Sequence, residues 1–181
     1  MSDEDTVKPQ KSEIIEKRSF RLLGCVYYGD PFHSEAGWTE ENEIGLTWQR
    51  FMTIFQKNQE LIEKFIVNED FGYELHIEPE EYKDTKKYYV FVGMEVSEEI
   101  KEIPMEMFIK VLPTTMYAVF TFKGKDIIRA GNYIWHNWLP KSDKYEEAYP
   151  YEIQAYERKR YFGLNDERSE IDFYIPIKLK E

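Results

Sequence analysis

The spacing of apolar residues in the first half of the chain predicts strand, helix, strand and strand. An apolar run over 20–28 has strand composition and ends at Gly29-Asp30-Pro31. Two further strands are predicted over 73–77 and 88–96, and residues 79–87 between them are predicted to form a charged turn. A helix is expected between the first two strands, because four large apolar residues recur there at the spacing of one helix face: Ile44, Trp48, Phe51 and Phe55. A short second helix is expected over 59–67.

The second half repeats this order with clearer boundaries. Strands are predicted over 106–112 and 116–123, across the turn Pro113-Thr114-Thr115. A helix bearing two tryptophans follows from Asp126, a plausible N-cap, to Trp138. Strands over 151–161 and 170–178 complete the chain. Tyr151-Glu152-Ile153 in this half corresponds to Tyr73-Glu74-Leu75 in the first half, since each triplet opens the strand after a Trp-bearing helix.

The two halves together predict an α+β fold made of duplicated β-α-β-β units with pseudo-two-fold symmetry. Each antiparallel sheet is expected to carry one main helix, with a ligand groove between the repeats. We expect residues 1–15 to be a flexible acidic and polar tail. Residues 16–181 are expected to form a single domain, with repeat one at about 16–103 and repeat two at about 104–181.

Composition narrows the classes of partner. The chain has 181 residues, of which 42% are hydrophobic and 17% aromatic, which is enough for a sizeable core. Its formal net charge of -11 argues against nucleic acid and anionic membranes as partners, because both require clusters of Lys and Arg. The lone Cys25 fits a reducing compartment and is expected to be a buried, inert thiol. With no long apolar run and no apolar signal core at the N-terminus, we expect a cytoplasmic protein.

Several common chemistries have no sequence signal. His33, His76 and His136 lie far apart, without metal-ligand spacing, so no metal is expected. There is no Gly-rich phosphate loop and no nucleophile elbow, and no cofactor is expected. Nothing predicts a helix-turn-helix, so the domain is expected to stand alone without binding DNA directly.

Four stretches carry a resemblance to a known family: Tyr88 to Ser97, Val111 to Gly124, Trp135 to Ser142, and Asp172 to Lys178. In this order and spacing they resemble the GyrI-like small-molecule-binding domain, which is also the effector-binding domain of AraC- and MerR-type multidrug regulators. The resemblance implies a bacterial protein with the duplicated β-α-β-β fold. It also implies that bulky, flat and often cationic molecules bind in an aromatic groove that contains a carboxylate.

The position of that carboxylate departs from the family pattern. Members that resemble the binders but hydrolyse strained, cyclopropane-type DNA-alkylating compounds have a Glu two residues before a Tyr on the penultimate strand. Here Gln154 stands two residues before Tyr156. The resemblance therefore points to Glu152, which keeps the same parity, or to Glu157 if a bulge shifts the register.

Strand alternation extends the list of candidate ligand-binding residues. Glu152, Gln154 and Tyr156 share one face of their strand, and the strand over 88–96 and the last strand each have an aromatic second face. The further candidates are Tyr89, Phe91, Tyr174, Trp135, Trp138 and, in the loop over 30–43, Trp38. Aromatic residues on strands are more often packing than pocket residues. Trp135 and Trp138 cannot both lie on one narrow stripe, so one is free to pack beneath the helix while the other reaches the groove.

Three functions remain open at this point. The favoured one is sequestration of a flat aromatic or cationic compound in the groove. The second is hydrolysis of an electrophilic compound, with Glu152 or Glu157 directing a water molecule. The third is interaction with a basic protein partner, in the manner of gyrase-inhibitory members of the family, and it is the least favoured.

Overall fold

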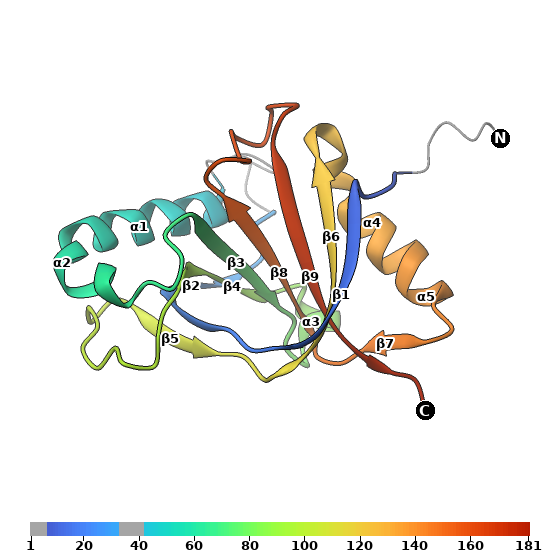
Figure 1. Ribbon diagram of the computed structural model, residues 1–181, viewed down its shortest axis with the longest axis horizontal. Helices are drawn as coiled ribbons and strands as arrows, with labels where there is room; N and C mark the ends of the chain where they lie inside the picture. Colours follow the sequence, from blue (N-terminus) through green and yellow to red (C-terminus); the bar gives the residue numbers. More distant parts are fainter. Residues whose placement is uncertain (1–6, 33–41) are drawn as a thin grey trace. The chain divides into compact units, whose positions relative to one another are not determined.

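The computed structural model describes residues 7–32 and 42–181, and the chain divides into two compact units. Unit 2 is the continuous segment Ser19–Thr114, and unit 1 combines Met1–Arg18 with Thr115–Glu181. Each unit consists of an antiparallel sheet with a helical segment on one face (Figure 1), which confirms the predicted α+β class. The unit boundaries differ from the predicted repeats, because some strands that are adjacent in sequence belong to different units.

The sheet of unit 2 has the strand order β3-β4-β2-β5. Its strands are β2 (Arg21–Gly29), β3 (Phe71–Ile77), β4 (Tyr88–Glu95) and β5 (Phe108–Val111). Gly24 of β2 lies opposite Gly93 of β4, and a Cβ on Gly24 would lie 1.9 Å from the carbonyl oxygen of Val92. The two strands therefore approach more closely here than side chains would allow.

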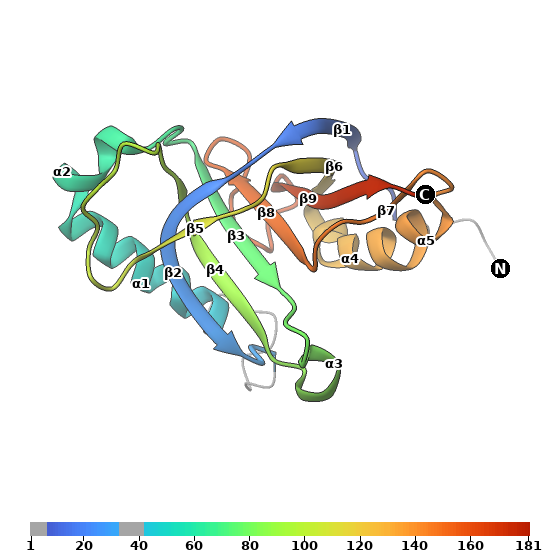
Figure 2. The same cartoon turned by 90° about the horizontal axis from the view of Figure 1, so that it is seen from below.

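The helices of unit 2 cover one face of this sheet (Figure 2). Helix α1 (Glu43–Lys57) begins at Asn42, whose side chain accepts hydrogen bonds from the amides of Ile44 and Gly45. It is followed by α2 (Gln59–Ile62) and the 3-10 turn η2 (Glu63–Phe65). A short helix, α3 (Tyr82–Thr85), lies within the segment predicted as a charged turn. The core between α1 and the sheet includes Leu23, Cys25, Phe51, Val90 and Val92.

The sheet of unit 1 has the order β1-β6-β9-β8, with β7 also pairing with β9. Its strands are β1 (Lys11–Arg18), β6 (Thr115–Lys123), β7 (Tyr145–Glu147), β8 (Tyr151–Glu157) and β9 (Glu170–Leu179). Residues 11–15, predicted as part of a flexible tail, instead form β1. This strand is polar and mostly exposed, so its composition gave no strand signal. Its backbone pairing with β6 is what orders it.

Strands β5 and β6, which flank the predicted turn at 113–115, do not pair with each other. Strand β5 pairs with β2 of unit 2, whereas β6 pairs with β1 and β9 of unit 1. The boundary that was predicted at about residues 103 and 104 therefore lies elsewhere in the structure. Unit 2 begins after Arg18 and ends at Thr114.

The helical segment of unit 1 is continuous but irregular. It runs through the 3-10 turn η3 (Gly124–Arg129), α4 (Ala130–Tyr133), the π-helical turn η4 (Ile134–Trp138) and α5 (Leu139–Lys141). Asp126 is not an N-cap, because the segment already begins at Gly124, which adopts a φ of 54°. The segment packs on a core that includes Ala118, Phe120, Phe122, Phe173 and Ile175.

Within the described residues, every helix is too short or too polar to cross a membrane.

Candidate functional site

In unit 1, four of the candidate residues form a continuous hydrogen-bonded chain. Nε1 of Trp135 donates to Oε2 of Glu152 across 3.2 Å, and Nε2 of Gln154 donates to Oε1 of Glu152 across 3.1 Å. The hydroxyl of Tyr156 donates to Oε1 of Gln154 across 3.0 Å. Both oxygens of Glu152 therefore accept a hydrogen bond from a neutral donor.

The fold explains why these side chains meet. Glu152, Gln154 and Tyr156 alternate along β8 and so project from one face of the sheet. Gln154 lies opposite Phe173 of β9, whose ring belongs to the core beneath the helical segment. The three residues are thus on the helix-bearing face, where the π-helical turn η4 brings Trp135 to the carboxylate.

Unit 2 contains a second pair of the same kind, which the sequence analysis did not assign to a site. Nε1 of Trp48 on α1 donates to Oε2 of Glu74 on β3 across 2.7 Å. Nε2 of His76 lies 2.7 Å from Oε1 of the same carboxylate. Glu74 is only 4% exposed, and Gly72 leaves room for the indole, since a Cβ there would lie 3.0 Å from the Trp48 ring.

The two pairs occupy equivalent positions in the two units. In each, a helix supplies the tryptophan, and the middle residue of the triplets Tyr73-Glu74-Leu75 and Tyr151-Glu152-Ile153 supplies the carboxylate. The residue two positions later contacts the second carboxylate oxygen in both units. The matching triplets were the signal in the sequence that could have pointed to the Trp48–Glu74 pair. They indicated only that the two halves repeat, because a triplet alone does not show which way its Glu points.

Two of the remaining candidates, Tyr89 and Phe91, project from the opposite face of their sheet. Their neighbours Val90 and Val92 pack against α1, so Tyr89 and Phe91 point away from α1 and from Glu74. Phe91 is 3% exposed, whereas Tyr89 is 40% exposed and lies 4.6 Å, between ring centroids, from Tyr28.

Tyr174 belongs to a cluster of tyrosines on the face of the unit 1 sheet that lies away from the helical segment. Its ring centroid is 6.0 Å from that of Tyr117, whose hydroxyl lies 2.6 Å from the hydroxyl of Tyr151. Burial raises the pKa of all three phenols, and for Tyr117 the hydrogen bond to Tyr151 raises it further. The structure therefore does not bring Tyr174 to the Glu152 side of its sheet.

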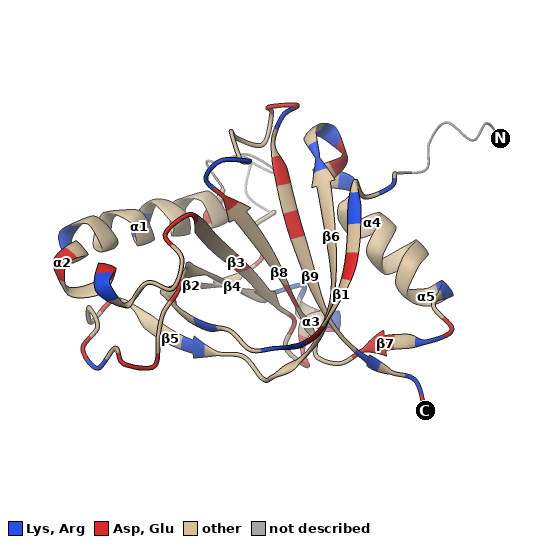
Figure 3. Cartoon of the chain, in the orientation of Figure 1, with Lys and Arg blue, Asp and Glu red and all other residues tan. Residues whose placement is uncertain are grey.

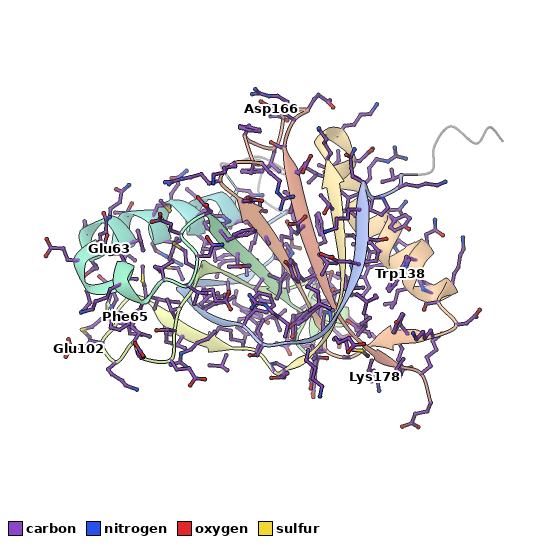
Figure 4. All side chains as sticks on the ribbon, in the orientation of Figure 1. Glu63, Phe65, Glu102, Trp138, Asp166 and Lys178 are labelled. Carbon is purple, nitrogen blue, oxygen red and sulfur yellow. The ribbon has the colours of Figure 1, made fainter. Side chains whose placement is uncertain are left out.

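The two tryptophans of unit 1 make different contacts. Trp135 reaches Glu152, whereas Trp138 (labelled in Figure 4) packs into the core, with its ring centroid 4.9 Å from that of Phe120. The remaining tryptophan candidate, Trp38, lies outside the described residues.

Glu157, the alternative carboxylate, belongs to an ion-pair network at the end of β8. Its side chain binds the guanidinium of Arg160, which also contacts Glu170 and Asp172 of β9. Figure 3 shows the acidic residues along β9. The hydrogen bond from Arg160 to Asp172 is the main cause that raises the pKa of the guanidinium. Glu157 thus acts as a partner of Arg160 and lies on the face opposite Glu152.

The thiol of Cys25 is buried, with 1% exposure, and burial raises its pKa. Among residues 7–32 and 42–181, no three His, Cys, Asp or Glu side chains come together in a group that could hold a metal ion.

Comparison with known proteins identifies the kind of domain to which these pairs belong. The family model described as Cass2, integron-associated effector binding protein, matches residues 13–177. No curated protein sequence matches the chain.

Solved structures share the fold at low sequence identity. The structure of SAV2435 bound to tetraphenylphosphonium is 14% identical with a TM-score of 0.60, covering 93% of this chain and 94% of that one. The integron cassette protein VCH_CASS2, from the mobile metagenome of Vibrio cholerae, is 16% identical with a TM-score of 0.59, covering 94% and 98%. The C-terminal domain of EcmrR is 12% identical with a TM-score of 0.62, covering 93% and 97%.

Proposed function

Because the chain belongs to the Cass2 family of integron-associated effector-binding proteins, we propose that it binds flat aromatic or cationic small molecules through Glu152 and Trp135. In this proposal Glu152 supplies the counter-charge, and Trp135 with Tyr156 supplies aromatic surface. A cation gains both from the carboxylate and from the face of an indole ring. Sequestration of the compound, which leaves it chemically unchanged, is the activity.

The observation that carries the proposal is the way in which Glu152 is held. The indole of Trp135 and the amide of Gln154, both neutral donors, orient its carboxylate. A half-buried carboxylate attracts a cationic ligand more strongly than a fully hydrated one, because water screens it less. The tetraphenylphosphonium bound to SAV2435 is a bulky aromatic cation of the class proposed here.

Hydrolysis is the alternative function. A structure described as a hydrolase from Listeria innocua shares the fold, with a TM-score of 0.51 and 10% identity. A hydrolase would need a general base that takes a proton from water, whereas a trap for cations needs only a carboxylate placed beside an aromatic surface.

The test is calorimetric titration of the full chain with tetraphenylphosphonium, comparing wild type, Glu152→Gln and Asp143→Asn. Asp143 is an exposed carboxylate of the same unit and serves as a control for loss of one surface charge. We expect Glu152→Gln to weaken binding by about tenfold or more and Asp143→Asn to leave it nearly unchanged. Equal affinities for wild type and Glu152→Gln would refute the role of this carboxylate.

Mass spectrometry of the recovered ligand completes the test. Incubation with a cyclopropane-type electrophile should return the compound at its original mass. A gain of one water that is lost in Glu152→Gln would instead establish the hydrolase.

A further inference from the structure

The two tryptophan–carboxylate pairs differ at one position, which is His76 in unit 2 and Gln154 in unit 1. We propose that Trp48, Glu74 and His76 form a second recognition site for an organic cation, and that protonation of His76 switches the charge of that site. The proposal rests on the proposed function, because it assigns to unit 2 a site for the same class of ligand.

The contacts around Glu74 match those of Glu152 and are tighter. The indole of Trp48 donates to Glu74 across 2.7 Å, compared with 3.2 Å for Trp135 and Glu152. Glu74 is buried, and the side chain of His76 is 15% exposed. The Trp48 side chain is half-buried, so part of its surface is exposed.

The difference between His76 and Gln154 changes the net charge beside which a cation would bind. Gln154 is neutral at every pH, so the charge of Glu152 is never cancelled by its strand neighbour. An imidazole changes its charge between about pH 5 and pH 8. When His76 is protonated, it cancels the charge of Glu74 at a distance of 2.7 Å; when it is neutral, the pair carries one negative charge. Affinity for a monocation at this site therefore rises with pH.

Other titratable groups surround the pair. The ring of Tyr88 on β4 lies 5.3 Å from the His76 ring, and Tyr82 of α3 packs edge-on against Tyr88. Burial raises the pKa of Tyr82. The further groups on neighbouring elements of unit 2 are Tyr27, Asp30, Glu43, Arg50 and Glu78. Tyrosine, arginine and ordinary carboxyl groups do not change charge between about pH 5.5 and pH 8, so histidine titration dominates this window.

The experiment is a calorimetric titration with tetraphenylphosphonium at pH 5.5 and pH 8, because the charge of this probe does not depend on pH. Neutral triphenylphosphine oxide is the control ligand. The variant His76→Gln places in unit 2 the residue that unit 1 already has, and Gln154→His makes the reverse exchange. Thermal melts confirm that each variant is folded.

We expect the dissociation constant of the unit 2 site for tetraphenylphosphonium to rise about five- to tenfold from pH 8 to pH 5.5 in wild type, as expected for the loss of one nearby unit charge, while the unit 1 site keeps its affinity. His76→Gln should bind as wild type does at pH 8 and lose this dependence. Gln154→His should make the dependence steeper. Binding of triphenylphosphine oxide should not change with pH.

A wild-type measurement keeps the proposal testable if His76→Gln does not fold. In NMR titrations of the histidine rings, bound tetraphenylphosphonium should lower the pKa of His76, because the coupling of proton and cation is reciprocal.

The outcomes separate the two proposals. Failure of wild type to bind tetraphenylphosphonium at pH 8 would overturn the proposed function and this site with it. Binding that is independent of pH, or equally dependent in His76→Gln, would overturn the switch at His76 alone. An unchanged His76 titration on ligand binding would likewise contradict it.

Discussion

Replacing Trp48, Trp135 and Trp138 by phenylalanine, one at a time, should separate two contributions to stability. One is the hydrogen bond from an indole to a carboxylate, and the other is the packing of the ring. Each Trp→Phe change removes part of a half-buried ring, which costs about 1–2 kcal/mol of unfolding free energy. Trp48→Phe also removes a 2.7 Å hydrogen bond to the buried Glu74, and such a bond to a charged group contributes about 1.5–3 kcal/mol. We therefore expect a total loss of about 3–4 kcal/mol for Trp48→Phe.

The two other tryptophans provide a graded comparison. Trp135→Phe loses a longer bond, of 3.2 Å, to the more exposed Glu152, so we expect a loss of about 2–3 kcal/mol. Trp138→Phe loses mainly ring contacts with Phe120 and Tyr145 and should cost about 1–2 kcal/mol.

The assay is equilibrium unfolding in urea, followed by circular dichroism so that the signal does not depend on the tryptophans themselves. Comparing the urea dependence of the three variants checks that the unfolded states are equivalent. If Trp48→Phe is no more destabilising than Trp138→Phe, the hydrogen bond to Glu74 does not stabilise the fold and the reasoning above is wrong.

Further predictions concern three other parts of the molecule: the Tyr117–Tyr151 pair, the Arg160 network and Cys25. Tyr117→Phe should cost about 1–2 kcal/mol, because it leaves the buried hydroxyl of Tyr151 without this partner. Folding raises the pKa of both phenols, so the folded state keeps protons that the unfolded state releases, and wild-type stability should fall above about pH 10; urea unfolding of the double Phe variant should show a shallower fall. Arg160→Met should lower the unfolding free energy by about 2 kcal/mol, whereas Arg168→Ala, at an exposed ion pair, should leave the urea midpoint nearly unchanged; equal effects would contradict a structural role for the network. Cys25 should react with a disulfide reagent only after unfolding, and fast reaction of the native protein would show that its burial is incomplete in solution.

The sequence was sufficient for the elements whose apolar spacing is strong. The stripe at Ile44, Trp48, Phe51 and Phe55 predicted α1, and alternation placed β3, β4, β8 and β9 near their observed bounds. It was insufficient for β1, because a polar strand at a sheet edge is specified by its pairing partner and not by burial.

The candidate site could be predicted only in part from the sequence. Parity correctly grouped Glu152, Gln154 and Tyr156, because alternation is a local property of one strand. It could not reveal which face carries the helix, so Tyr89, Phe91 and Tyr174 were grouped with residues from the opposite side of a sheet. The role of Glu74 was missed because its partner Trp48 lies 26 residues away.

The pairing of β1 with β6 means that the order in which the chain is synthesised affects how unit 1 folds. Unit 2 is encoded by one uninterrupted segment, whereas unit 1 is assembled from the two ends of the chain, like a domain that has received an insertion. Strand β1 is synthesised roughly a hundred residues before its partner β6. The pairing that offsets the entropic cost of closing this loop therefore forms late. Unit 2 can form its core before the later strands of unit 1 are made, and Glu152 on β8 reaches its final surroundings only after β9 has followed.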